Sequence, residues 1–310
     1  MSSSTTPASA TFSRALAALA TLSACALAAP LAAQPAKPTP TLKIETSHSG
    51  KTDLEARGAA VGEVAVSRVT TSIALPLAPI SESTTLSTDF GYSGFYLDRS
   101  GPVALPEKLE SIEAGVSTRH RFDERWSLIA RISAGVAGSG GTFSSDGFNA
   151  GLFALANYQF SKTFSAGAGF VYNSLSESLP VMPIAGVRWD FAPDWRFTLA
   201  FPSTRVSWTA SERLSLHVSL DLDTGSFHVK DDPRPATIGV GGRPSLRDSI
   251  LDYTAISAGL GADYRLTDSL NLDATLGYNF SRTADFDDRG YEIEANEGAP
   301  IIRLGLAYAF

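Results

Sequence analysis

The residue pair best suited to chemistry is His217 and Ser219, which stand two apart in a stretch where apolar and polar residues alternate. In a β-strand, residues two apart project from the same face. The imidazole could therefore take the proton of the hydroxyl and activate it as a nucleophile, with Asp221 next in the same row. One interpretation of this row is a hydrolase. The opposite face of the stretch is aliphatic and consists of Leu214, Leu216, Val218, Leu220 and Leu222.

The pair also resembles the His-x-Ser pair that outer-membrane lipid hydrolases carry on one strand. An enzyme of that kind presents the pair to the bilayer. In this chain the aliphatic row would claim the lipid side, which turns His217 and Ser219 into the interior. We therefore expect an interior hydrogen-bonded pair and no enzyme activity, with the lipid hydrolase as the alternative.

Charged residues of both signs stand on the polar face of several alternating stretches. The arginines are Arg119, Arg121, Arg131, Arg188, Arg265 and Arg303, and the acids are Glu113, Asp190, Asp221, Asp223, Asp263 and Asp273. Their shared parity predicts that they face one another in the interior. They would then form a paired network that fills and stiffens the fold, or a constriction that selects solutes. We expect the structural role.

A second acidic group surrounds Gly290 and consists of Asp285, Asp287, Asp288, Glu292 and Glu294. Carboxylates suit Ca²⁺, but this spacing fits no standard calcium loop, so we expect a solvated external loop, with divalent bridging to lipopolysaccharide as a variant. The chain has no Gly-rich phosphate loop, no metal-spaced set of His and Cys, and no basic aromatic stripe. We therefore predict no cofactor, no metal and no nucleic-acid partner.

The elements that position these residues are predicted to be strands, because polarity alternates with period two almost throughout. The same tight-turn pattern recurs four times: three mostly polar residues separate two bulky apolar ones at residues 122–126, 160–164, 191–195 and 266–270. The strands run for 10–14 residues with one apolar face and one polar or glycine-rich face, as lipid-facing barrel strands require. Longer connections rich in Gly, Ser, Asp and Pro alternate with the short turns.

We expect an all-β fold, an antiparallel transmembrane β-barrel of about 12–14 strands over residues 41–310. The fourteen expected strands are 41–48, 61–76, 84–95, 109–122, 125–137, 147–160, 163–174, 182–191, 195–208, 212–222, 225–230, 252–265, 269–281 and 300–310. The outward parity changes at Pro202, which predicts a bulge within 195–208. Twelve strands are the alternative count, and a secreted soluble β-sandwich is the alternative fold.

The N-terminal residues 1–33 are predicted to be a secretory signal, with Arg14 before an Ala/Leu run and cleavage after Ala33. An N-terminal membrane anchor is one alternative. Lipidation at Cys25, the only cysteine, is another. Residues 34–40 would form a Pro-rich linker. The acidic balance, a formal net charge of −7, argues against nucleic acid as a partner.

The last strand carries Gly305, Tyr308 and the terminal Phe310. It resembles the terminal strand of Gram-negative outer-membrane barrels, which the barrel-assembly machinery reads. The stretch Phe201-Pro202-Ser203-Thr204-Arg205-Val206-Ser207-Trp208, followed by a polar turn and an alternating strand, resembles a family of uncharacterised bacterial outer-membrane barrels. These resemblances imply location in the cell outer membrane, with its lipids and lipopolysaccharide as partners. The family implies no activity. We expect a passive channel for small solutes or a filled structural barrel.

Overall fold

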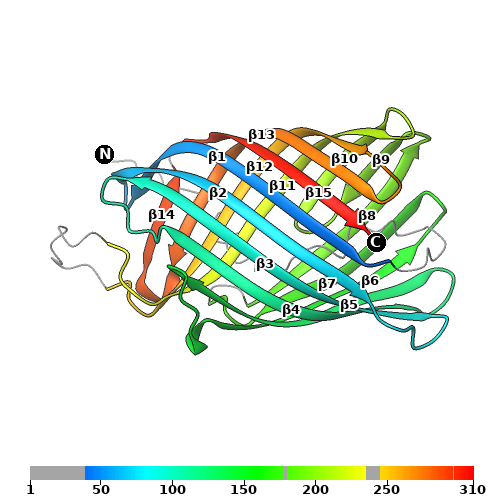
Figure 1. The fold of residues 1–310 in the computed structure, drawn as a ribbon, viewed down its shortest axis with the longest axis horizontal. Coiled ribbons are helices and arrows are strands. Elements are labelled where there is room, and N and C mark those ends of the chain that lie inside the picture. Colours follow the sequence, from blue (N-terminus) through cyan, green and yellow to red (C-terminus); the bar gives the residue numbers. More distant parts are fainter. Residues whose placement is uncertain (1–38, 178–179, 235–244, 296) are drawn as a thin grey trace, which may run out of the picture.

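The alternating segments form one antiparallel sheet that closes on itself, in a computed structural model that describes residues 39–177, 180–234, 245–295 and 297–310 (Figure 1). The strands are β1 (Thr41–Ala56), β2 (Ala59–Pro76), β3 (Thr84–Ser100), β4 (Lys108–Arg121), β5 (Trp126–Ser139), β6 (Phe148–Gln159), β7 (Phe164–Asn173), β8 (Val181–Ala192), β9 (Trp195–Leu199), β10 (Ser203–Thr209), β11 (Leu214–Val229), β12 (Ser249–Arg265), β13 (Leu270–Phe286), β14 (Tyr291–Ala295) and β15 (Ala299–Ala309).

The barrel closes where β15 pairs with β1, from Thr41 opposite Ala309 to Ser49 opposite Ile301. Beyond that point β14 lies between β13 and β1, so β14 and β15 share one position in the ring. The result is a closed barrel of fourteen strands. The predicted fold class is confirmed, and the alternative of a soluble two-sheet sandwich is wrong. Among the described residues no helix is long and apolar enough to cross a membrane.

The two ends of the barrel differ in their connections. At one end, called here the short-turn end, the chain reverses within a few residues. The backbone N–H of Phe122 donates to the Trp126 carbonyl at 3.0 Å, and Phe160 and Phe164 repeat the frame at 3.0 Å. The C-terminus lies there, with the Phe310 N–H donating to the Pro40 carbonyl at 3.1 Å. The opposite end, called the loop end, carries the longer connections, apart from the tight turns between β1 and β2 and between β9 and β10.

Two predicted boundaries are wrong, and their errors cancel in the strand count. The phase change at Pro202 marks a chain reversal, because β9 and β10 pair with each other from Thr204 opposite Leu199 to Trp208 opposite Trp195. Pro202 has no N–H with which to continue a ladder. Residues 212–222 and 225–230, predicted as two strands, form the single strand β11, since β12 pairs with it through Asp223 and Gly225. The count of fourteen strands is therefore unchanged.

The short β9–β10 hairpin leaves a lateral notch in the wall toward the loop end. Pairing of β8 with β9 starts at Val187, and pairing of β10 with β11 stops at Asp221. Among the described strands, residues 181–186 of β8 and 223–227 of β11 therefore have no paired strand on the side of the hairpin. Pro183 lies on that free edge of β8, where a residue without an N–H is tolerated. The end of β11 leans across to β5 and forms one parallel bridge, His228 to Gly138.

The outward face of the barrel is apolar. Leu260, Leu276 and Ile132 are 67%, 66% and 62% exposed, although they sit in the middle of regular strands. Near the short-turn end, aromatic rings form neighbouring pairs. These are Trp126–Tyr158, Tyr158–Phe160, Trp189–Phe191, Trp195–Trp208 and Tyr308–Phe310, with ring centroids 4.7–6.0 Å apart. An apolar band edged by aromatic rings is the surface that suits a bilayer.

The loop end is filled from inside by a cluster of buried apolar side chains, called here the loop-end core. Phe227 belongs to it and shares the inward face of β11 with Ser219. Phe227, Phe95 and Phe286 are at most 1% exposed. The members are Leu54, Ala56, Val61, Val64, Val66, Phe95, Leu97, Val103, Ala104, Leu105, Leu109, Ala137, Leu175, Phe227, Val229, Leu246, Leu251, Tyr253, Ala255, Ala284, Phe286, Tyr291 and Ile293. The inward face thus changes from polar to apolar along each long strand.

The connection between β11 and β12 is tied to the loop-end core through Leu246. Its backbone N–H donates to the Asp232 carboxylate at 3.2 Å, and the Arg234 Nε donates to the same carboxylate at 2.8 Å. The hydrogen bond from Arg234 lowers the pKa of Asp232 to about 2. The carboxylate therefore stays ionised, and holds Leu246 in place, down to strongly acidic pH.

The acidic group around Gly290 does not lie in a loop over 282–299, as predicted. It belongs to a hairpin, in which β13 continues to Phe286, β14 returns, and Asp285 stands opposite Glu292. A register shift opposite Ile256 puts Arg282, Ala284 and Phe286 on the inward face, where they are buried. The strand is prolonged because its apolar residues reach the loop-end core. Asp288 pairs with Arg289 at 2.9 Å. The predicted signal segment 1–33, with Cys25, lies outside the described residues.

Candidate functional site in the barrel lumen

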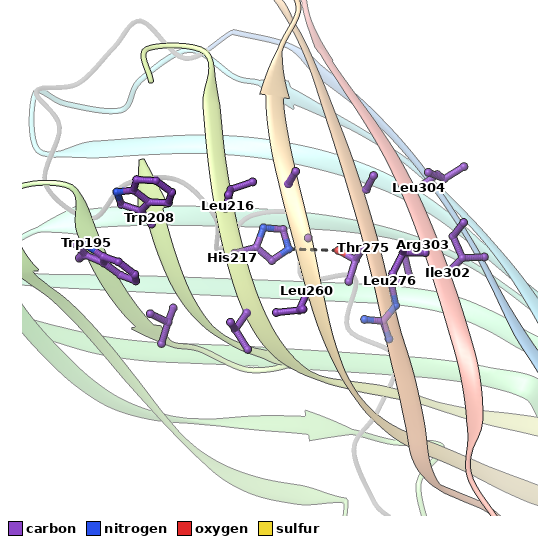
Figure 2. Close-up of a pocket in the computed structure, with 15 residues that line it drawn as sticks. Trp195, Trp208, Leu216, His217, Leu260, Thr275, Leu276, Ile302, Arg303 and Leu304 are labelled. Atoms are coloured by element: carbon purple, nitrogen blue, oxygen red, sulfur yellow. Dashed lines mark hydrogen bonds between the residues drawn. The ribbon is translucent and has the colours of Figure 1, made fainter. Parts of the chain in front are cut away.

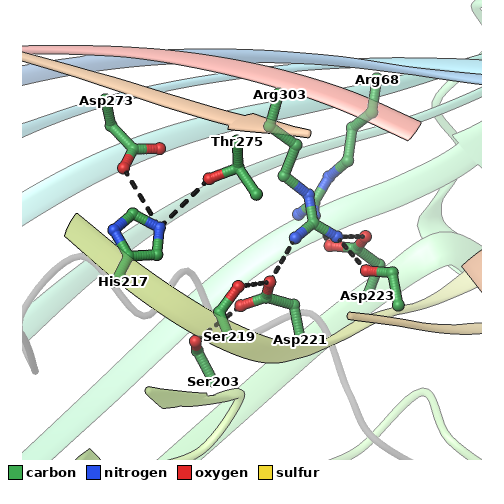
Figure 3. A network of polar contacts seen from close by, with 10 residues as sticks. Arg68, Ser203, His217, Ser219, Asp221, Asp223, Asp273, Thr275 and Arg303 are labelled. Atoms are coloured by element: carbon green, nitrogen blue, oxygen red, sulfur yellow. Dashed lines mark hydrogen bonds and ion pairs between the residues drawn. The ribbon is translucent and has the colours of Figure 1, made fainter. Parts of the chain in front are cut away.

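Arg303 of β15 connects strands on either side of β12 and β13. Its guanidinium donates to Asp221 at 2.6 Å and to Asp223 at 2.8 Å, both on β11 (Figure 3). Arg68 of β2 reaches the other oxygen of Asp223 at 2.5 Å from across the lumen. Two arginines thus balance two carboxylates, and every one of these side chains is at most 20% exposed. These ion pairs therefore connect β2, β11 and β15 across the lumen.

Two further charge clusters lie on the inward face. Arg131 of β5 donates to Asp89 at 2.5 Å and to Glu113 at 3.2 Å, with its side chain 5% exposed. Gly115 makes room for it, because a Cβ there would lie 2.8 Å from the guanidinium. The second cluster lies nearer the short-turn end. There Asp190 accepts from Arg188 at 2.9 Å and from Arg196 at 2.5 Å.

Three predicted members of the charge network do not join it. Arg121 and Arg265 stand at the last positions of β4 and β12 and are exposed, and Arg119 is partly buried. None of the three has an ion pair within the described part of the chain. The structure instead adds Arg68, Asp89 and Arg196, which sequence reasoning missed. The alternation of polar and apolar residues is the signal that could have placed these three residues on the inward face. In β2, however, valines stand on both faces, so this alternation is not visible around Arg68.

His217 and Ser219 both face the lumen, but they do not form a catalytic pair. Ser219 donates to Asp221 at 2.7 Å, and Ser203 donates to the same carboxylate at 2.6 Å. His217 turns the other way, and its Nε2 forms a hydrogen bond with Thr275 Oγ1 at 3.2 Å (Figure 3). No hydrogen bond joins His217 to Ser219 in the described structure. The geometry therefore provides no activated serine.

His217 reaches across β12 because Gly261 has no side chain. The register places His217 opposite Gly261, and Gly261 opposite Thr275. A Cβ on Gly261 would lie 2.3 Å from His217 Nε2 and 2.5 Å from the Thr275 hydroxyl. The imidazole therefore sits beside a facing pair of carboxylates, Asp263 and Asp273. Its Nδ1 lies 3.2 Å from Asp263 Oδ2, and its Nε2 lies 3.8 Å from Asp273 Oδ2.

A lumen cavity of about 1030 Å³ leads from the short-turn end to Asp263, one of these two carboxylates. Ala192, Pro193 and Asp194, at the turn between β8 and β9, line one side, and Asp263 and Ser215 line another. Charged side chains project into it from β8, β9 and β10, namely Arg188, Asp190, Arg196 and Arg205. Ala200, Phe201 and Pro202 close it toward the notch. The cavity is large enough for a small solute and polar enough to hold a charged one.

The outward face carries a separate apolar groove of about 490 Å³ over β9 to β15. Trp195 and Trp208 edge it, and leucines and isoleucine from neighbouring strands line it (Figure 2). Its position in the apolar band is where lipid chains would lie. Figure 2 also shows the hydrogen bond from His217 to Thr275 behind this groove.

A closed barrel with an apolar exposed face and a polar lumen has the architecture of outer-membrane barrel proteins. Residues 44–308 match the family model of a domain of unknown function, DUF6268. The chain belongs to this family. The predicted membership of an uncharacterised family of barrels is thereby confirmed.

Two solved structures to which the chain is similar share little sequence with it. An outer-membrane channel from Pseudomonas putida F1 is 11% identical with a TM-score of 0.51, over 91% of this chain and 99% of that one. The translocator domain of the autotransporter NalP from Neisseria meningitidis is 17% identical with a TM-score of 0.41, over 89% and 90%. The likeness to the channel shows the fold alone. The comparison with curated proteins gave no match.

Proposed function

We propose that the protein is an integral β-barrel of the Gram-negative outer membrane that acts as a channel for small polar solutes, closed at the loop end in this conformation. The observation that supports this proposal most strongly is the charged cavity of about 1030 Å³ inside a barrel whose exposed face is apolar. The similar structure from Pseudomonas putida F1 is an outer-membrane channel, which supports the same class. The predicted signal segment supports export.

The orientation follows from the connections. The short-turn end would face the periplasm, since barrels of this class have short periplasmic turns and longer external loops. Pro40 and Phe310 meet at that end. Tyr308 and Phe310 are 42% and 55% exposed on the outward face, where the barrel-assembly machinery could reach them. Outer-membrane lipids and lipopolysaccharide are then the neighbours of the apolar band.

A filled structural barrel is the second candidate, and the loop-end core is the observation that favours it. Phe227 and Phe286 are fully buried there, and the arginine clusters bridge the lumen below. Passage through the barrel would require the loop-end core to open. The two candidates therefore differ in whether this core ever moves aside.

Single-channel recording in planar bilayers separates the candidates. We expect the wild type to show brief, small openings, and Phe227→Ala with Phe286→Ala to open more often, because the double variant removes two large side chains from the loop-end core. Tyr278→Ala with Phe280→Ala is the matched control. It removes the same number of rings from the outward face, where both are about half exposed, and should behave as the wild type.

Silence of both the wild type and the Phe227/Phe286 variant, with each inserted and folded, would reject the channel and favour the structural barrel. The lipid hydrolase has its own readout. Release of fatty acid from phospholipid by the wild type, lost in Ser219→Ala, would favour it over both.

A further inference from the structure

We propose that His217, Asp263 and Asp273 form a binding site for a divalent metal ion of the zinc type, on the inward face of β11, β12 and β13. Each residue offers one ligand atom, and these atoms lie within 4.8 Å of one another. It is the one such group among the residues that the structure describes. The proposal concerns binding and does not depend on transport through the lumen.

The three side chains lie close enough together to hold one ion, with one ligand atom from each. His217 Nδ1 lies 3.2 Å from Asp263 Oδ2. Ligand atoms about 2.0–2.2 Å from a tetrahedral metal stand roughly 3.3 Å apart, so this edge already has the required length. The facing strands hold Asp263 and Asp273 opposite each other, and Gly261 leaves the space through which the imidazole enters.

The imidazole is prepared to act as a ligand. Its side chain is fully buried, and within the described structure its Nδ1 has no hydrogen-bond partner, in spite of the nearby Asp263. Oδ2 of Asp273 is likewise buried without a hydrogen bond. When Nε2–H donates to Thr275, Nδ1 directs its lone pair at a carboxylate, an arrangement that a cation between them would stabilise. The hydrogen bond to Thr275 thereby holds the ring in this orientation.

The charge balance also favours a cation. Two carboxylates face each other across the β12–β13 pair, where like charges destabilise a sheet. The nearby cationic side chain is Arg205, 3.3 Å from Asp263. A bound divalent ion would offset the remaining negative charge. Access is provided from the short-turn end, because Asp263 lines the cavity that opens there.

One imidazole nitrogen and two carboxylate oxygens define the class of metal. Ca²⁺ and Mg²⁺ prefer ligand sets made of oxygen alone, whereas Zn²⁺ accepts nitrogen and oxygen together. With three protein ligands, the fourth position would remain open to water from the cavity. The site would therefore bind zinc in preference to magnesium.

The test uses the full-length barrel, purified without a polyhistidine tag, in detergent and freed of metal by chelation. Titration calorimetry with Zn²⁺ should show one ion per chain, with no comparable signal for Mg²⁺. Asp273→Asn and His217→Gln should each weaken binding about tenfold or more. Asp190→Asn is the matched control, since Asp190 lies in the same cavity within a different cluster, and it should bind as the wild type.

A second measurement covers variants that fold poorly. Zn²⁺ should raise the temperature at which the wild-type barrel unfolds in detergent, and a chelator should reverse the shift. An absence of both binding and shift in the wild type would overturn the proposal and leave His217 as a polar side chain packed between two carboxylates. Undiminished binding in both ligand variants would overturn it as well, by placing the ion elsewhere.

Discussion

Gly261 shows how a missing side chain decides which polar groups meet in the lumen. With any Cβ at this position, the His217 ring could not lie over β12 and touch Thr275. The same holds at Gly115 beneath Arg131. In a narrow barrel, the glycines of the inward face are therefore spaces that long polar side chains of neighbouring strands occupy. The glycine-rich face that marks the lumen in the sequence is also what allows its charge clusters to form.

Arginine on the outward face should be far more damaging than arginine in the cavity. Leu260 and Leu276 face each other across β12 and β13 on the outward face. Leu276→Arg is expected to lower the free energy of unfolding by about 2–4 kcal/mol, because the charge must enter the hydrocarbon region. Urea unfolding in lipid vesicles measures this. Ser215→Arg, which enters the cavity beside Asp263, is the control, and equal tolerance of both changes would show that the faces are assigned wrongly.

The terminal strand β15 closes the barrel, since it pairs with β13 on one side and β1 on the other. We expect Tyr308→Ser with Phe310→Ser to reduce the amount of barrel in the outer membrane severely, because both outward rings at the end of the closing strand are lost. Immunoblots of membrane fractions measure the amount. Tyr278→Ser with Phe280→Ser removes two outward rings at the same spacing from β13. Equal losses in both variants would mean that the terminal position has no special role.

Elements with regular alternation could be predicted from the sequence, and elements that depend on what they pair with could not. The faces of β11, β12 and β13 within the apolar band follow from period two, because large apolar residues such as Leu216, Leu260 and Leu276 mark the outward side there. The sequence predicts a bulge where β9 and β10 reverse, because a proline at a change of parity has the same appearance in a bulge and in a turn. Residues 223–224, which the sequence predicts to separate two strands, lie inside β11, because pairing with β12 continues straight through them.

The candidate site was predictable in its parts but not in its assembly. The inward parity of His217, Asp263 and Asp273 follows from the sequence. Their meeting depends on the register of three strands, and parity leaves register open by any even number of residues. Arg303 was expected in the lumen for the same reason, whereas its partners on β11 emerge only once the ring is closed.

At the scale of the whole molecule, closure predicts resistance to detergent. Every strand position of the ring has hydrogen-bonded neighbours on both sides over at least part of its length, so the barrel should stay folded in dodecyl sulfate until it is boiled. We expect unboiled and boiled samples to migrate differently in a gel. The Leu276→Arg variant should lose the folded band at a lower temperature than Ser215→Arg. Identical mobility before and after boiling would speak against a closed barrel.

The short β9–β10 hairpin has a consequence for the surrounding lipids. Strands of five and seven residues, at about 3.3 Å per residue and tilted by 35–45°, rise roughly 12–19 Å along the membrane normal, against an apolar band of about 25 Å in barrels of this class. Beside this hairpin, the height of the protein wall would be smaller than the thickness of the hydrocarbon layer that the acyl chains form. The annulus of lipid would have to thin there, next to Trp195 and Trp208, and keep its full depth beside the long strands on the opposite side. One side of the protein would then be a local defect in the membrane that contains it.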